Sequence, residues 1–161
     1  ATTPVFDGPE DRNGRRNHDE VIFWRHLLDG ALPPGAPLAA VEPEAADRPR
    51  GLPSPFVILG GANLDPKRGE GRREAIRALL GDSRLQDPAP RWDAPDLTEG
   101  DTTVDWPAEG PGRMRVDYVL PSADLFLHDA GVLWPLAGAP MAEAVAAASR
   151  HRLIWVEVDL P

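Results

Sequence analysis

A short apolar run that breaks into a glycine-rich loop constrains the fold of this chain most. Residues 56–59 read Phe-Val-Ile-Leu, which predicts one buried strand, and Gly60, Gly61, Ala62 and Asn63 then predict a loop. Loops that follow the strands of α/β proteins often carry the chemistry. The residues at 63–66, Asn-Leu-Asp-Pro, are also typical of an ordinary turn, so this stretch alone leaves both interpretations open.

Two later segments favour the functional interpretation. Residues 113–122 alternate polar and apolar side chains, which predicts a strand with its arginines and Asp117 on one face. The sequence Ser-Arg-His-Arg at 149–152 stands directly before residues 153–160, whose apolar pattern predicts a C-terminal strand. Three polar motifs therefore occur in a fixed order beside predicted strands.

In this order, the three segments resemble the endonuclease/exonuclease/phosphatase superfamily, the DNase-like metal-dependent phosphoesterases. The family pattern is Gly-Asp-Phe-Asn-x-x-Pro, then Arg-x-Asp-Tyr, then Ser-Asp-His before a last apolar strand. The matching residues here are 60–66, 115–118 and 149–151, and the resemblance extends back to Thr3-Pro4. Two positions depart from the pattern, because Gly61 and Arg150 stand where the family has acids.

The resemblance implies an α/β (α+β) fold, the DNase-like four-layer α/β/β/α sandwich. A chain of 161 residues can form a core, yet the family's sandwich is generally larger. We therefore expect residues 1–161 to be roughly the C-terminal half of a single endonuclease/exonuclease/phosphatase domain. In relatives the N-terminal half supplies the Asn and Glu that hold the metal, so the main ligands are expected in that absent half. Any metal ligand within this chain is unknown.

The resemblance also implies phosphoester hydrolysis, with His151, Asp117 and Asn63 as the catalytic residues. The Asn63 amide is expected to donate to a phosphoryl oxygen, and Asp117 to pair with His151 and fix its tautomer. Gly61 offers no acid or base, so general-base catalysis at that position is expected to be impaired. Asp65 is a conceivable replacement acid, although its position before a proline favours a turn.

Substrate binding is assigned to Arg115, Arg150 and Asn63. A guanidinium at position 150 repels a divalent cation but binds a phosphate oxygen bidentately. The cofactor implied by the resemblance is Mg²⁺ or another divalent cation. The partners implied are a small phosphate ester or a nucleic-acid phosphodiester, as for a nuclease, and the complementary N-terminal half. The alternative is a catalytically inactive family member that acts as a binding or structural module.

Charge and composition limit the partners further. The net charge of −9 argues against a broad nucleic-acid-binding surface and favours a small phosphate ester. No stretch approaches the roughly 18 apolar residues of a membrane span, so no membrane partner is expected. The chain has no cysteine and its first residues do not form a signal peptide, which leaves its localisation open.

The remaining expectations concern the elements. Residues 32–55 are rich in proline and predict a surface excursion. Core or interface positions are expected for the aromatic residues Trp24, Trp106, Trp134 and Trp155. One sheet is expected, with helices on one face and an exposed apolar face on the other. The predicted strands are 56–60, 114–120, 124–127 and 153–160, and the predicted helices are 18–28, 71–80 and 140–148.

Overall fold

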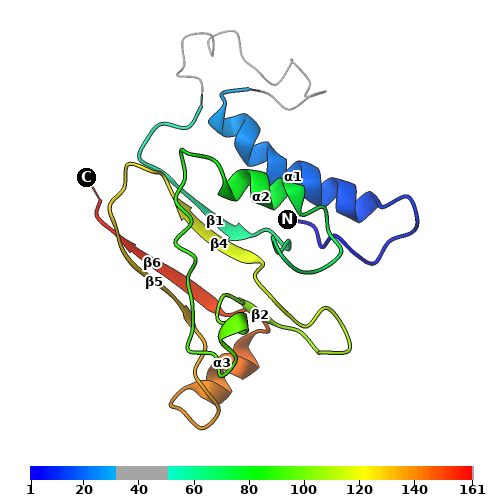
Figure 1. Cartoon of the computed structure of the whole chain (residues 1–161), viewed down its shortest axis with the longest axis vertical. Coiled ribbons are helices and arrows are strands. Elements are labelled where there is room, and N and C mark those ends of the chain that lie inside the picture. The colour runs from blue at the N-terminus through cyan, green and yellow to red at the C-terminus, as the bar shows by residue number, and fades with distance from the viewer. Residues whose placement is uncertain (32–50, 161) are drawn as a thin grey trace.

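The computed structural model describes residues 1–31 and 51–160, so most of the predicted excursion at 32–55 lies outside the described residues. The chain mixes helices and strands (Figure 1). In chain order, the elements are α1 (Arg12–Leu28), β1 (Val57–Gly61), α2 (Glu74–Leu80), the 3-10 helix η3 (Leu97–Glu99), β2 (Val104–Asp105), β3 (Arg113–Met114), β4 (Asp117–Pro121), β5 (Leu127–Leu133), α3 (Ala142–Ala148) and β6 (Leu153–Val158).

The described strands form three antiparallel pairs, β1 with β4, β2 with β3, and β5 with β6. In the first pair Leu59 lies opposite Val119 and Gly61 opposite Asp117. A single bridge joins Val104 of β2 to His151, just before β6, and β4 lies beside β6. The one continuous sheet that the sequence predicted is therefore divided into short ladders linked by isolated bridges.

The main core lies between β1–β4 and the two helices that cover one face of this pair (Figure 1). Strand alternation turns Ile58 of β1 and Leu120 of β4 inward, where they are almost fully buried. Val21 of α1 and Ile76 of α2 pack into the same cluster. The predicted exposed face is also present on the outer side of the strand pairs. Its exposed apolar residues are Val57, Leu59, Leu133, Leu153 and Trp155. We call this set of residues the outer apolar face.

Two strand predictions were wrong. Residues 113–122 do not form one strand, because the backbone N–H groups of Arg115 and Val116 donate to the side chains of Asp65 and Thr103 instead of to a neighbouring strand. The predicted strand at 124–127 is displaced, since β5 begins at Leu127 and continues for seven residues.

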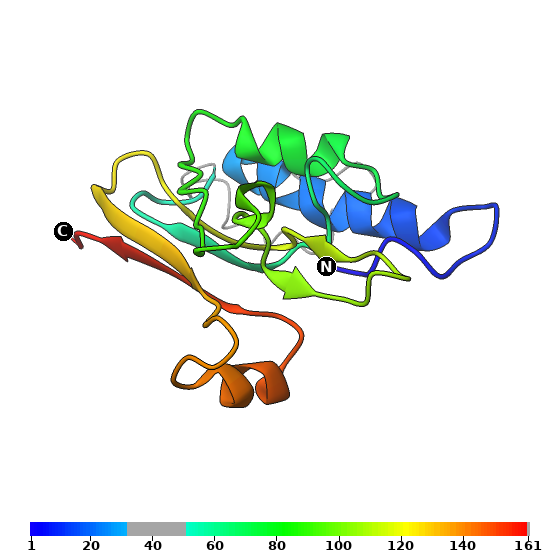
Figure 2. The same ribbon diagram turned by 60° about the horizontal axis from the view of Figure 1, so that its bottom comes forward.

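The helix predictions hold in part. Helix α1 begins at Arg12, well before the predicted start at residue 18, and Asn17 lies buried within it. Helix α3 contains no buried residue and lies apart from α1 and α2 (Figure 2). The prediction that all three helices cover one face of the sheet is therefore wrong for α3.

Candidate active site

His151 and Asp117 form a direct side-chain pair. Asp117 is the first residue of β4, and His151 lies between α3 and β6, where a bridge to Val104 holds its backbone. The Nδ1 atom of His151 lies 2.9 Å from Oδ2 and 3.1 Å from Oδ1 of Asp117. This confirms the geometry that the motif predicted. The imidazole side chain is 41% exposed and the carboxylate 17%, so the pair is open to a ligand from the histidine side.

Thr103 holds the carboxylate of this pair and was missed by the sequence reasoning. Its hydroxyl donates to Oδ2 of Asp117 over 2.9 Å and accepts the backbone N–H groups of Val116 and Asp117 at 3.0 and 3.1 Å. Thr103 is fully buried. Three bonds at one hydroxyl therefore fix both the backbone and the side chain of Asp117. No local pattern in the sequence marked this residue.

Trp106 contacts the imidazole ring of His151. The two ring centroids lie 5.8 Å apart with the ring planes at 87°, an edge-to-face contact. The same indole packs against the cluster of Val104, Met114 and Val116. The sequence predicted a core or interface aromatic residue here, and the structure adds that this residue borders the histidine of the site.

Asn63 lies at the same end of the β1–β4 pair. The N–H groups of Ala62 and Asn63 both donate to the carbonyl oxygen of Val116, at 2.8 and 3.2 Å, which places Asn63 beside the residue before Asp117. Its backbone is left-handed with φ of 51°, a conformation that asparagine tolerates better than most residues. Its Nδ2 atom donates to the carbonyl oxygen of Ala1 over 2.6 Å, which leaves the second hydrogen of the amide for another acceptor.

Gly61 lies directly opposite Asp117 in the β1–β4 ladder. A Cβ atom built at position 61 would lie 3.2 Å from Oδ1 of Asp117. The backbone there is not left-handed, so its conformation does not require glycine. An acid at this position would consequently place a second carboxylate beside the first, after a shift of a few tenths of an ångström.

Arg115 does not reach this site, contrary to the expectation that it binds substrate. Its side chain is 6% exposed and forms an ion pair with Asp87, with Nη1 2.9 Å from Oδ2. The guanidinium also lies over the ring of Tyr118 at 4.7 Å. Burial alone would raise the pKa of Asp87, but the hydrogen bonds and charge of Arg115 outweigh it and lower that pKa. Arg115 is therefore occupied in the interior of the fold.

Asp65 has the turn role that the sequence favoured. Its fully buried carboxylate accepts the backbone N–H groups of Lys67, Arg68 and Arg115 at 2.7, 2.9 and 2.7 Å. An ion pair with the side chain of Arg68 completes its contacts. The carboxylate thus joins the loop after β1 to the segment before β4, and it is not a replacement for the acid missing at Gly61.

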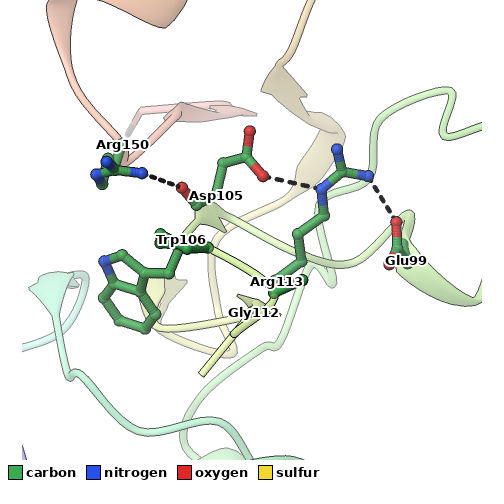
Figure 3. A pocket seen from close by; sticks show the side chains of 8 residues that line it. Glu99, Asp105, Trp106, Gly112, Arg113 and Arg150 are labelled. Atoms are coloured by element: carbon green, nitrogen blue, oxygen red, sulfur yellow. Dashed lines mark hydrogen bonds and ion pairs between the residues drawn. The ribbon is translucent and has the colours of Figure 1, made fainter. Parts of the chain in front are cut away.

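Arg150 is exposed and lines a hollow of about 530 Å³ together with Trp106 and Arg113 (Figure 3). A second cavity, of about 570 Å³, lies on another side of Trp106 and includes Asn63. Apolar side chains such as Phe6 and Met114 line much of this second cavity. Open space therefore borders Asn63, and it borders Trp106 and Arg150, the two residues beside His151.

The side chains at this site do not fit a divalent metal. Within residues 1–31 and 51–160, no three histidine, aspartate or glutamate side chains converge on one point. Asp117 already accepts a hydrogen bond from Thr103 and contacts His151. The cationic Arg150 directly precedes His151 in the chain. In the same described ranges, no helix is long and apolar enough to cross a membrane.

The comparisons with known proteins agree with the motif order. Residues 2–151 match the sequence model of the Endonuclease/Exonuclease/phosphatase family, and this match covers most of the chain. The matched region includes the loop after β1, the Asp117 strand and His151. No curated protein and no solved structure matches the chain.

Proposed function

The chain belongs to the endonuclease/exonuclease/phosphatase family, which consists largely of hydrolases, and on this basis we propose that it is a metal-dependent phosphoesterase. Its substrate would be a phosphodiester or a phosphomonoester. The observation that carries the proposal is the contact between His151 and Asp117, because an imidazole oriented by a carboxylate can hold and transfer a proton at its other nitrogen.

Each residue of the site has a role that follows from its contacts. With Nδ1 of His151 bound to Asp117, Nε2 is the nitrogen that faces a phosphoryl oxygen. The free amide hydrogen of Asn63 donates to a second phosphoryl oxygen, where negative charge develops during hydrolysis. Thr103 acts as a positioning residue through Asp117, because it touches the carboxylate and is itself fully buried.

Family members commonly use divalent metal ions, and such an ion would supply positive charge to the phosphoryl group. Since the described side chains do not fit a metal, we propose that its ligands lie in a complementary N-terminal half of the domain. The chain would then be the C-terminal half of a four-layer α/β/β/α sandwich. The outer apolar face supports this proposal, because exposed side chains such as Leu59 and Leu153 suit a second sheet packed against them.

Gly61 and Arg150 support the second candidate, a catalytically inactive relative that keeps an anion site. Position 61 lies beside Asp117 yet carries no acid, and position 150 carries a cation where the family has an acid. We propose that the missing acid impairs hydrolysis, since loss of a general base typically costs on the order of 10²–10⁴ in rate.

Hydrolysis assays separate these two functions. The substrates are 4-nitrophenyl phosphate and bis(4-nitrophenyl) phosphate, and the chain is tested with the residues encoded upstream of Ala1, with Mg²⁺ or with a chelator. We expect metal-dependent product release that is slow with Gly61 and much faster in Gly61→Asp, while Gly61→Asn gives no gain. Equal rates for Gly61 and Gly61→Asp would show that this acid is not the base. Product release that persists in chelator would overturn the metal-dependent assignment.

A further inference from the structure

The hollow beside Trp106 has two acidic and two arginine side chains in its lining, and we name it the arginine hollow (Figure 3). It adjoins the His151 site in two ways. Arg150 is the chain neighbour of His151, and Trp106 touches the His151 ring while forming one wall of the hollow. A group bound there would lie next to a phosphoryl group at His151. The lining residues used below are Glu99, Asp105, Trp106, Arg113 and Arg150.

The two carboxylates that line the arginine hollow are held in ion pairs by arginines other than Arg150. Arg113 binds both acids, with Nη1 2.6 Å from Glu99 and Nε 3.0 Å from Asp105 (Figure 3). The hydrogen bond to Asp105, followed by that to Glu99, raises the pKa of Arg113 above its ordinary value despite some burial. Arg152 lies 3.5 Å from the same Asp105 carboxylate. Two guanidinium groups therefore neutralise two carboxylates.

Arg150 forms no ion pair within the described parts of the chain. Its Nη1 atom makes a long hydrogen bond of 3.3 Å to the carbonyl oxygen of Asp105 (Figure 3). A guanidinium has five N–H donors in a planar fork, so most of the donors of Arg150 remain available. This fork matches two oxygens of a phosphate group. An anion is thus the ligand that the unpaired guanidinium of Arg150 can bind.

We propose that the arginine hollow binds a second, non-reacting phosphate group of the substrate, so that the preferred ligands are organic bisphosphates. The inference rests on the proposed function, which places the reacting phosphate at Asn63 and His151. Arg150 then holds the second phosphate, and Trp106 supports the part of the ligand that joins the two groups. A volume of about 530 Å³ accommodates a phosphate and its linker.

Two kinds of bisphosphate share this chemistry. A nucleoside bisphosphate adds a planar base that can stack on the indole of Trp106, whereas a sugar bisphosphate has no aromatic ring. Thymidine 3′,5′-bisphosphate and fructose 1,6-bisphosphate are therefore the two probes, and thymidine 5′-monophosphate is the probe that lacks the second phosphate. Tighter binding of the thymidine bisphosphate would identify the base as part of the recognised ligand.

Calorimetric titration of the intact chain at fixed salt concentration tests the proposal. We expect at least one bisphosphate to bind roughly tenfold more tightly than the monophosphate, as for a charged hydrogen-bonded pair. In Arg150→Gln, the bisphosphate and the monophosphate should bind with similar affinity. Arg77→Gln is the matched control and should keep the difference in affinity, because Arg77 is also exposed and donates to a backbone carbonyl, that of Pro66, outside the hollow.

The outcomes separate this inference from the proposed function. Equal binding of the monophosphate and both bisphosphates, no bisphosphate binding, or an unchanged ratio in Arg150→Gln would overturn the arginine hollow as a phosphate site. If that occurs while the aryl phosphates are hydrolysed, the proposed function stands without it. Binding that depends on Arg150 in a protein that hydrolyses nothing would support the hollow and favour the inactive relative.

Discussion

The Nδ1 atom of His151 lies 2.9 Å from Oδ2 of Asp117, so one defined nitrogen of the imidazole contacts the carboxylate. An ionised carboxylate only accepts hydrogen bonds, which places the proton of the neutral ring on Nδ1. The Nε2 atom of His151 is then unprotonated in the neutral ring. This tautomer underlies the role that we propose for the residue.

Nitrogen NMR of the imidazole rings checks the tautomer directly. We predict a protonated Nδ1 for neutral His151 and a shift of the proton towards Nε2 in Asp117→Ala. His128 is an internal control of the opposite kind, since its Nε2 atom lies 2.8 Å from Asp159 and should carry the proton. Spectra in which neutral His151 is protonated at Nε2 would contradict the observed pair.

Thr103→Val tests the positioning of Asp117. The substitution keeps the shape of the side chain but leaves the backbone N–H groups of Val116 and Asp117 without their acceptor. We predict a loss of about 2 kcal/mol in the free energy of unfolding, because a buried unpaired donor costs about 1–3 kcal/mol. Thr98→Val, at an exposed threonine, should change it by less than about 0.5 kcal/mol. Equal urea midpoints for the two variants would refute the role of Thr103.

We predict that the fold loses stability in acid as Asp82 becomes protonated. Hydrogen bonds from Arg84 are the largest cause that lowers its pKa from 3.8 to about 2. Because the pKa is lower in the folded chain, the stabilisation is complete above about pH 4 and disappears as the pH falls to about 2. As the pH falls over this interval, the free energy of unfolding should decrease by on the order of 1 kcal/mol less in Asp82→Asn than in the parent chain. Parallel curves for the two proteins would rule out this contribution.

Neighbouring residues of β1 test the two faces of the strand. Ile58 is 6% exposed within the core, whereas Leu59 on the outer apolar face is 68% exposed. We predict that Ile58→Ala lowers the free energy of unfolding by about 2–4 kcal/mol, whereas Leu59→Ala lowers it by less than about 1 kcal/mol. Chemical denaturation measures both. The reverse order would show that the strand faces are assigned the wrong way round.

The meeting of the motif residues was predictable because the order of the motifs resembles that of the endonuclease/exonuclease/phosphatase family. Asp117 and His151 meet as expected, since each stands at the start of a strand and β4 lies beside β6. Thr103 and Trp106 were not predicted as site residues, because their contacts with Asp117 and His151 join distant segments and leave no local pattern.

Local sequence patterns also gave wrong strand predictions where a side chain, and not a neighbouring strand, accepts the backbone hydrogen bond. Arg115 fits an alternating strand in the sequence, yet its backbone N–H donates to buried Asp65 and its guanidinium turns towards Asp87. Strand β5 was placed too early and too short. Its register is irregular between Leu127 and Asp129, and its sequence does not alternate strictly.

The assignment of His151 as a catalytic residue is tested by the rate of hydrolysis in His151→Gln. The assay follows 4-nitrophenol release with Mg²⁺ from the chain joined to the residues encoded upstream of Ala1 and carrying Gly61→Asp. His128→Gln is the control, since that histidine pairs with Asp159 on the other strand pair. We predict that His151→Gln lowers the rate by on the order of 10²-fold or more, while His128→Gln leaves it unchanged. Equal rates for His151→Gln and its parent would contradict the assignment of this active site.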